Sequence, residues 1–293
     1  MIKILIIGAD SFVGKNFISF SKYREVKEIS LIDSKPENIS FIDIDVVIHL
    51  AAIVHQSKST PDSEYFRVNR DLCLEVAKYA KINGVKQFIF LSTFKVYGNV
   101  IPDSVVLNEQ SPCFPTDAYG KSKYDAELGL NSMEDKNFTV SIIRTPLVYG
   151  DGVKANMLSL LKLVDTFRIL PFKNVANNRN YTFVENLVGY IDKIIEFNAS
   201  GVFIAMDEYP VSTTELVNYI AKYFNKKVYL FKIPEVLMKI SKTQFPGIIN
   251  RLFGSFEFDN RKTLEALHFK PPYSSEEGIK KMVLAYQRKK YTK

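Results

Sequence analysis

The sequence predicts an α/β fold in which helices cover both faces of a doubly wound parallel sheet. In the first half of the 293 residues, short apolar runs alternate with segments of helical periodicity, as in strands joined by crossover helices. The composition, with 46% hydrophobic and 24% charged residues, is that of a soluble globular protein. A chain of this length folds as one large domain or two small ones.

Apolar runs in the first half predict strands at 2–7, 29–32, 46–50, 88–91 and 139–143. Helical patterns between them lie at 12–20, 63–83 and 118–131. Later helices are expected at 156–164, 184–197, 213–224 and 275–287, and later strands at 202–205 and 228–231. We therefore expect a sheet domain over 1–150 and a smaller α/β lobe over 151–293. This lobe would close over a cleft and return a late strand to the sheet.

Net charge and cysteine content exclude several classes of protein. The formal net charge is +7 and the pI is near 9.1, but the lysines are scattered. The densest basic cluster, 288–290, lies at the chain end, and no nucleic-acid motif accompanies it. No apolar run reaches the ~20 residues of a membrane helix, and the first strand has no signal-peptide pattern. Cys73 and Cys113 have no metal or redox spacing. From these observations together we expect a cytoplasmic protein without metal, nucleic-acid or membrane partners.

A glycine-punctuated turn follows the first strand and leads into a helix. Gly8 permits the tight turn and Gly14 lets helix and strand pack closely, while Ser11 stands where such loops often have a third glycine. Backbone N–H groups at this place suit a pyrophosphate. About 20 residues further on, Asp33 is placed to accept from a ribose hydroxyl and would repel a 2′-phosphate. The sequence therefore favours NAD; Lys35 nearby keeps NADP as an alternative.

Tyr119 and Lys123 stand four residues apart in a predicted helix, so they share one face. A lysine beside a tyrosine favours the phenolate, which lowers the pKa of the tyrosine and suits proton exchange near neutral pH. The spacing alone is weak evidence in a chain with 16 tyrosines and 39 lysines and arginines.

Four further stretches give the pair a context. They are DVVIHLAA at 45–52, FLSTFKVYG at 90–98, RTPLVYG at 144–150 and RNYTFVE at 179–185. In this order, together with 119–123, they resemble the extended short-chain dehydrogenase/reductases, the NAD-dependent epimerase/dehydratase family. The resemblance covers nearly the whole chain and implies a Rossmann-type nucleotide domain with a C-terminal substrate lobe.

The resemblance implies a role for each motif residue. Tyr119 would be the general acid/base on a sugar hydroxyl or ketone, Lys123 would hold the nicotinamide ribose, and Thr93 would bond the reacting oxygen. The cofactor contacts that it implies are Gly8, Ser11, Phe12, Val13, Gly14, Asp33, Leu50, Ala51, Ala52, Tyr119, Lys123 and Pro146. The substrate contacts that it implies are Lys95, Asn156, Arg179 and Arg251, with Arg179 on the diphosphate of a nucleotide sugar.

Details narrow the choice within this family. The 4,6-dehydratases that the chain resembles carry Asp-Glu after the catalytic Ser/Thr, whereas this chain has Phe94 and Lys95. A dehydratase is therefore disfavoured. The stretches 90–96, 152–157 and 255–259 look like bacterial enzymes of surface-polysaccharide synthesis that reduce UDP-4-keto-6-deoxy-N-acetylhexosamines. These enzymes group near the UDP-glucose 4-epimerases.

Three functions are weighed on this basis. The first is 4-reduction of a UDP-linked 4-keto-6-deoxy-amino sugar, and the second is UDP-hexose 4-epimerisation with tightly bound NAD. The third is a dinucleotide-binding regulator without catalysis, which the intact catalytic residues disfavour. Ser11 and Leu147, the latter where many members have asparagine, depart from the family pattern. His49 and His55 lack an identifiable carboxylate partner and are given no role, and a homodimer is an open alternative.

Overall fold

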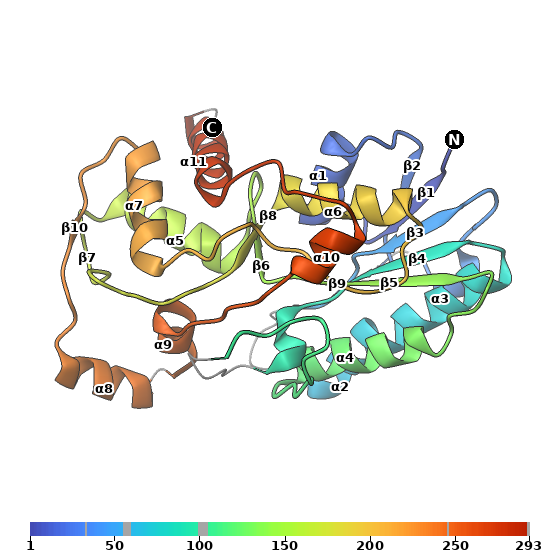
Figure 1. Cartoon of the computed structure of the whole chain (residues 1–293), viewed down its shortest axis with the longest axis horizontal. Helices are drawn as coiled ribbons and strands as arrows, with labels where there is room; N and C mark the ends of the chain where they lie inside the picture. The colour runs from blue at the N-terminus through green and yellow to red at the C-terminus, as the bar shows by residue number, and fades with distance from the viewer. Residues whose placement is uncertain (33, 55–59, 99–104, 245, 292–293) are drawn as a thin grey trace.

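The structure is a computed structural model that describes residues 1–32, 34–54, 60–98, 105–244 and 246–291. Within these residues, a parallel six-stranded sheet has the order β2-β1-β3-β4-β5-β9 (Figure 1). Its strands are β1 (Ile4–Ile7), β2 (Val26–Ile29), β3 (Val46–His49), β4 (Gln87–Leu91), β5 (Thr139–Arg144) and β9 (Gly201–Ile204). The strand order reverses at β1 and β3, and this switch point is where open α/β sheets bind their ligands.

Helices cover both faces of the sheet, as the sequence predicts. On one face lie α1 (Phe12–Phe20) and α6 (Val184–Glu196), and on the other α2 (Asp62–Phe66), α3 (Leu72–Ile82) and α4 (Ala118–Asn131). Along β1, Ile4 and Ile6 join the core under α1 and α6, while Leu5 and Ile7 join the core under α3 and α4. Because both faces are buried, the strand is a continuous apolar run.

The rest of the chain builds a second lobe with its own core, centred on Leu161, Phe172 and Val217. Its strands are β6 (Leu147–Tyr149), β7 (Ile169–Leu170), β8 (Tyr181–Phe183) and β10 (Tyr229–Leu230). Its helices are α5 (Ala155–Thr166), α7 (Thr213–Tyr223), α8 (Glu235–Gln244), α9 (Pro246–Phe253) and α11 (Ser275–Tyr291). Helix α10 (Arg261–Ala266) instead packs on the core of the large sheet, beside α6. Strand β9 returns to the large sheet, as the sequence predicts.

The second strand is misplaced in the sequence prediction. Strand β2 spans Val26–Ile29 and not 29–32, because its partner β1 runs only from Ile4 to Ile7 and then turns at Gly8. Residues beyond Ile29 have no strand to pair with. The charged residues Lys27 and Glu28 suit this edge position, although they weaken the apolar pattern from which strands are predicted.

The long predicted helix at 63–83 is divided. A π-helical stretch at Arg67–Asp71 lies between α2 and α3, and Gly84 follows the last turn with a φ of +80°. Helix α7 starts at a complete capping box between Ser212 and Glu215, and the Ser274 hydroxyl accepts from the N–H of Glu277 at the start of α11. Among the described residues, no helix combines the length and apolar character that crossing a bilayer requires.

Gly8 is predicted to be indispensable to the junction of β1 and β3. Its φ is +116°, and an added Cβ would lie 2.8 Å from the backbone nitrogen of Ala51. Gly201 provides a matched control, because its φ is +110° and an added Cβ would meet nothing within 4 Å. Gly201→Ala should cost about 1–2 kcal/mol from backbone strain, and Gly8→Ala roughly 1–3 kcal/mol more from overpacking.

Urea unfolding of the two variants measures the difference. Equal losses of unfolding free energy would show that the close approach between Gly8 and Ala51 is not a constraint on the fold.

Candidate active site

Helix α4 starts where the two lobes meet and carries the predicted proton-transfer residues. Asp117 caps it, since its Oδ1 accepts from the N–H of Gly120 at 2.7 Å, and its Oδ2 pairs with the ammonium of Lys95. Gly120 allows the helix to approach the turn after β4 closely, because an added Cβ would lie 2.8 Å from the carbonyl oxygen of Lys95. The helix start is thus fixed against the carboxyl end of β4.

Tyr119 and Thr93 are brought together at this junction. Thr93 follows β4 and caps a short 3-10 turn (Phe94–Tyr97), and its side chain is hydrogen-bonded to that of Tyr119. Tyr119 is half-buried, and burial raises the pKa of its phenol to about 12, with the Thr93 hydrogen bond acting in the opposite direction. The predicted lowering of this pKa by Lys123 is therefore wrong for the protein alone: loss of water around the phenol raises it, and Lys123 is not among the groups that shift it.

Lys123 is buried one turn further along α4. Its Nζ lies 3.7 Å from the ring centroid of Phe90, a cation–π contact. Burial lowers the pKa of Lys123 to about 8, against a smaller opposite effect of Cys73 and Glu127. The site thus holds a phenol that keeps its proton beside a lysine that gives its proton up more readily than usual.

A buried ion pair lies below these two residues on the same helix face. Glu127 Oε2 accepts from Arg144 Nη2 at 2.6 Å, and Arg144 stands at the carboxyl end of β5. The Ser92 hydroxyl donates to Glu127 Oε1, and Arg144 Nη1 donates to the Tyr97 hydroxyl at 2.8 Å. The network therefore joins α4 to the ends of β4 and β5, on either side of Thr93.

The turn after β1 has the features of a dinucleotide-phosphate cradle. The Gly14 N–H donates to the Ser11 hydroxyl oxygen at 3.1 Å, so Ser11 caps α1 and still has a hydroxyl proton to donate. Gly8 and Gly14 leave no room for side chains, because an added Cβ on Gly14 would lie 2.7 Å from Ser11 Oγ. The Phe12 and Val13 N–H groups belong to the first helical turn, which has no intrahelical acceptors. A pyrophosphate fits this donor set.

Three of the other predicted cofactor residues, Leu50, Ala51 and Ala52, lie at the switch point. The N–H groups of Leu50 and Ala51 both donate to the carbonyl oxygen of Ile7, at 2.8 and 2.9 Å, which sets the loop containing Ala52 beside the Gly8 turn. The Val13 side chain belongs to the core, so its backbone alone can reach a ligand. Further predicted cofactor residues are Pro146, in the loop after β5, and Asp33, which lies outside the described residues.

The predicted substrate residues lie toward the second lobe. Lys95 Nζ is paired with Asp117 and lies 5.8 Å from the Tyr119 ring centroid. Arg179 Nη1 donates to the carbonyl oxygens of Asn250 and Gly254, at 3.0 and 2.7 Å, so it lies against the end of α9. The two remaining predicted contacts are Arg251, within α9, and Asn156, exposed at the start of α5.

Comparison with known proteins identifies the family. Residues 4–204 match the model of the NAD dependent epimerase/dehydratase family. The chain belongs to this family. It is accordingly an NAD-dependent enzyme. The dinucleotide predicted from the Gly8–Gly14 turn agrees with the NAD dependence of this family.

Two curated relatives align over nearly the whole chain. A UDP-glucose 4-epimerase of Vibrio cholerae is 32% identical over 97% of this chain and 95% of its own length. An N-acetyl-α-D-glucosaminyl-diphospho-ditrans,octacis-undecaprenol 4-epimerase of Escherichia coli is 26% identical over 94% of this chain and 92% of its own length. The family resemblance read from the motifs is confirmed.

Solved structures confirm the fold. A UDP-glucuronic acid 4-epimerase from Bacillus cereus in complex with NAD is 18% identical with a TM-score of 0.76, covering 98% of this chain and 99% of its own. A dTDP-4-dehydrorhamnose reductase from Clostridium acetobutylicum is 20% identical with a TM-score of 0.79, covering 98% of this chain and all of its own. Epimerases and reductases thus share this architecture.

Besides Glu127, two polar residues at the epimerase/dehydratase site escaped the sequence analysis. The Asn69 amide lies fully buried in the π-helical stretch and bonds both the backbone of Ile53 and the Ser122 hydroxyl, which ties the loop after β3 to α4. Glu28 on β2 has a buried Oε1 without a partner, 3.2 Å from where a Cβ on Gly14 would lie. Neither stands in a recognisable motif spacing, and the π-helical stretch is not visible in the sequence.

His49, to which the sequence analysis gives no role, lies in the core of the sheet. It is fully buried on β3, between Phe88 and Phe90 at ring-centroid distances of 5.9 and 6.0 Å. Burial lowers the pKa of its imidazole to about 3, so the ring is neutral. The other histidine considered, His55, lies outside the described residues.

The Glu127–Arg144 pair should dominate the stability of the site. Arg144→Met leaves a buried carboxylate without its partner and should cost about 3–5 kcal/mol of unfolding free energy. The double variant Glu127→Met/Arg144→Met should be more stable than Arg144→Met alone. The exposed pair of Arg67 with Glu64 provides the control, since Arg67→Met should cost at most about 1 kcal/mol. Additive losses in a denaturant-based double-mutant cycle would contradict this coupling.

Lys123 should give stability a distinctive pH dependence. Its folded pKa of about 8 lies below the usual 10.5. Between these values the unfolded chain binds the proton and the folded chain does not, so stability rises with pH in this window. Relative to Lys123→Met, the wild-type unfolding free energy should rise by roughly 3 kcal/mol from pH 8 to 10.5. If the unfolding free energies of the two proteins changed in parallel with pH, the pKa of Lys123 would not be lowered by burial.

Proposed function

We propose that this protein exchanges a hydride between a nicotinamide cofactor and C4 of a UDP-linked sugar. The observation that carries the proposal is the convergence of Thr93, Tyr119 and Lys123 at the carboxyl end of β4, beside the dinucleotide turn. As first candidate we propose one-way reduction of a UDP-4-keto-6-deoxy-N-acetylhexosamine for surface-polysaccharide synthesis in the cytoplasm. The kinship of the stretches 90–96, 152–157 and 255–259 supports this choice.

The chain's own residues would move and hold the proton. The bound dinucleotide supplies the hydride when present. Tyr119, whose raised pKa keeps it protonated, would give its proton to the oxygen at C4, and the Thr93 hydroxyl would share a hydrogen bond with the same oxygen. Lys123 would hold the cofactor ribose and favour the phenolate left on Tyr119. Arg179 would neutralise the diphosphate of the substrate.

The residues after Thr93 argue against a dehydratase. Phe94 is 2% exposed and stacks on Phe258 at a centroid distance of 3.6 Å, and the Lys95 ammonium is paired with Asp117. Neither side chain can act as a second carboxylic acid or base at the sugar, so removal of the C6 oxygen has no catalyst here.

The second candidate is 4-epimerisation, in which the keto-sugar rotates in the site before the hydride returns to C4. The names of both full-length curated relatives favour it. It uses the same residues and requires that NAD stay bound between the two hydride transfers. The Escherichia coli relative's name also raises a sugar carried on diphospho-undecaprenol as an alternative to a UDP-sugar.

Turnover of defined substrates tests these candidates. With added NADH or NADPH, the protein should reduce UDP-4-keto-6-deoxy-N-acetylhexosamine. Conversion of UDP-GlcNAc or UDP-glucose to its C4 epimer without added nucleotide would select the second candidate. Activity on none of these substrates would contradict hydride exchange at C4 of a UDP-sugar.

Tyr119→Phe should lower turnover in either case by about 10²–10⁴-fold, since the proton donor is removed while the ring stays. Tyr124→Phe, on the same helix but packed against the neighbouring hydrophobic core, should retain activity. Binding of the cofactor, followed by fluorescence, should be retained by both variants. A fully active Tyr119→Phe enzyme would exclude the proposed proton donor.

A further inference from the structure

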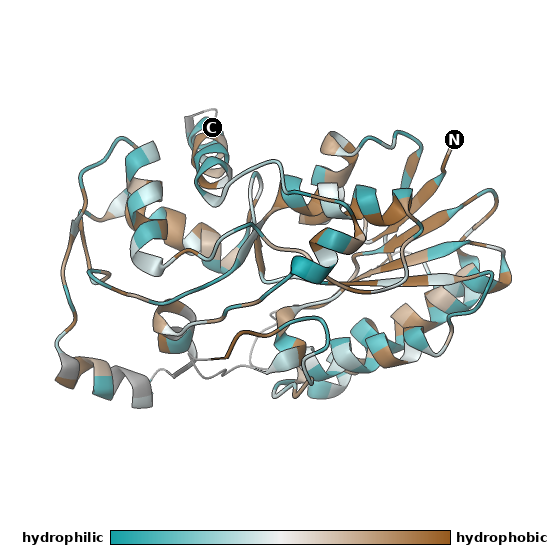
Figure 2. Cartoon of the chain, viewed as in Figure 1, coloured by the Kyte–Doolittle hydropathy of each residue, from teal (hydrophilic) through white to brown (hydrophobic). Residues whose placement is uncertain are grey.

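The outer end of the second lobe exposes a group of large apolar side chains, here called the apolar rim. Its members are Phe167, Ile169, Tyr229, Phe231, Val236 and Leu237, which are between 46% and 70% exposed. Large apolar groups held in water in one region mark an interaction surface. Figure 2 shows the same region, where helix α8 alternates apolar and polar colours at the end of the lobe.

Three members of the rim lie on one small sheet although they are far apart in sequence. Strands β7 and β10 pair in parallel with Ile169 opposite Tyr229, so these two side chains lie on one face. The Phe231 N–H donates to the carbonyl oxygen of Leu170 at 3.0 Å, which continues the pairing toward α8. This sheet therefore holds Ile169, Tyr229 and Phe231 together, and the chain that follows it leads to Val236 and Leu237 on α8.

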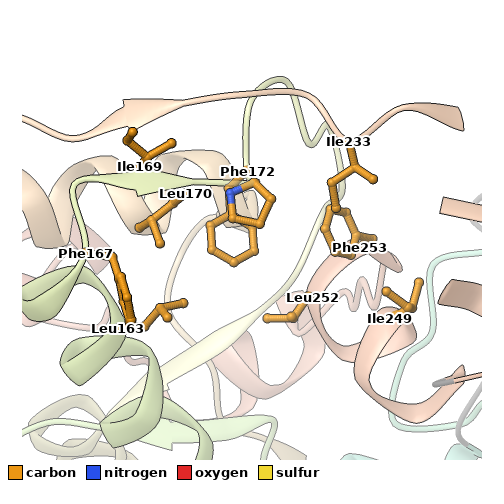
Figure 3. Close-up of a pocket in the computed structure, with 10 residues that line it drawn as sticks. Leu163, Phe167, Ile169, Leu170, Phe172, Ile233, Ile249, Leu252 and Phe253 are labelled. Atoms are coloured by element: carbon orange, nitrogen blue, oxygen red, sulfur yellow. The ribbon is translucent and has the colours of Figure 1, made fainter. Parts of the chain in front are cut away.

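An apolar groove of about 450 Å³ extends from the rim into the lobe (Figure 3). Phe167 and Ile169 line its outer side, and Ile233, Ile249 and Phe253 line the side formed by α9 and the chain before α8. All ten residues that line it are apolar. The rim thus continues into a recess that suits hydrocarbon. The side chains that line this recess have no hydrogen-bonding groups.

Exposed basic residues are interspersed in the sequence with the members of the rim. Residues 226–244 contain five lysines and one glutamate, and Lys227, Lys232 and Lys239 are exposed. Arg168 and Lys173, on either side of β7, are exposed as well. This interleaving of exposed apolar side chains with lysine is complementary to a surface that is anionic outside and hydrocarbon inside.

We propose that the apolar rim and its lysines dock the enzyme onto an anionic lipid bilayer. The apolar side chains enter the interface and the lysines meet the phosphate headgroups. This departs from the expectation of no membrane partner, which rested on the absence of a spanning segment; a peripheral surface needs none. Docking would bring the site near the bilayer, because α9 both lines the groove and accepts hydrogen bonds from Arg179.

The docked enzyme would act at the bilayer surface, where soluble sugar nucleotides meet membrane-bound reactions. A glycosyl-phosphate or glycosyl transfer at the same bilayer would consume its product, or a lipid-linked sugar diphosphate would reach its site from the surface. The docking surface is separate from Thr93, Tyr119 and Lys123, so it stands or fails independently of the proposed chemistry.

Vesicle sedimentation of the full chain tests the docking surface. The protein should sediment with vesicles of phosphatidylcholine mixed with phosphatidylglycerol, and stay in solution with phosphatidylcholine alone or at high salt. Lys232→Glu/Lys239→Glu should lower the affinity about tenfold or more. The control Lys78→Glu/Lys136→Glu makes the same charge change at exposed positions of the sheet domain and should bind like the wild type.

A second pair of variants tests the apolar component. Val236→Ser/Leu237→Ser removes side chains that are 70% and 54% exposed, and should weaken vesicle binding several-fold. The control Ile82→Ser/Leu128→Ser removes side chains that are 70% and 52% exposed on α3 and α4, and should leave binding unchanged. All four variants should keep wild-type turnover of a soluble UDP-sugar.

Three results would overturn the proposal. One is wild-type protein that stays in solution with anionic vesicles at low salt. Another is equal loss of binding in rim and control variants, which would indicate bulk charge alone. The third is a wild-type dimer, without vesicle binding, that the rim variants convert to monomer, because the rim would then join two copies of the chain. Turnover of UDP-sugars in these assays separates failure of docking from failure of the proposed function.

Discussion

The buried ion pair between Glu127 and Arg144 is the constraint on which the site depends. Four-residue spacing along α4 puts Tyr119, Lys123 and Glu127 on one face, and the ion pair fixes that face against the ends of β4 and β5. A buried carboxylate tolerates few positions, because its partner and its hydrogen bonds must all be present. The residues of α4 that we propose as catalytic therefore owe their position to a group that would have no direct part in the chemistry.

Burial sets the protonation of the site in the protein alone. It raises the pKa of Tyr119 and lowers that of Lys123, so burial makes the charged form of each group less favourable than it is in water. This arrangement suits a phenol that donates its proton to a newly formed alkoxide. The same pair would return the proton in the reverse direction, so proton transfer does not distinguish reduction from epimerisation.

The sequence predicted most of the fold but only part of the site. The bounds of α4 and the capping box at Ser212 were predictable because local patterns determine them. Strand β2 was not, since its length depends on where β1 ends. The sign of the Tyr119 pKa shift was wrong because spacing shows the neighbouring charge and not the loss of water. Glu127 and Asn69 were missed because their partners are far away in sequence.

The central claim is that hydride is exchanged at C4 of the sugar while Tyr119 supplies the proton. The most direct measurement supplies UDP-4-keto-6-deoxy-N-acetylhexosamine with NADH that carries deuterium at both hydrogen positions of nicotinamide C4, and locates the label by mass spectrometry and NMR. The account predicts one deuterium at sugar C4 with wild-type enzyme and a large loss of product with Tyr119→Phe. Deuterium at another sugar carbon, or product formed without transfer of the label, would contradict it.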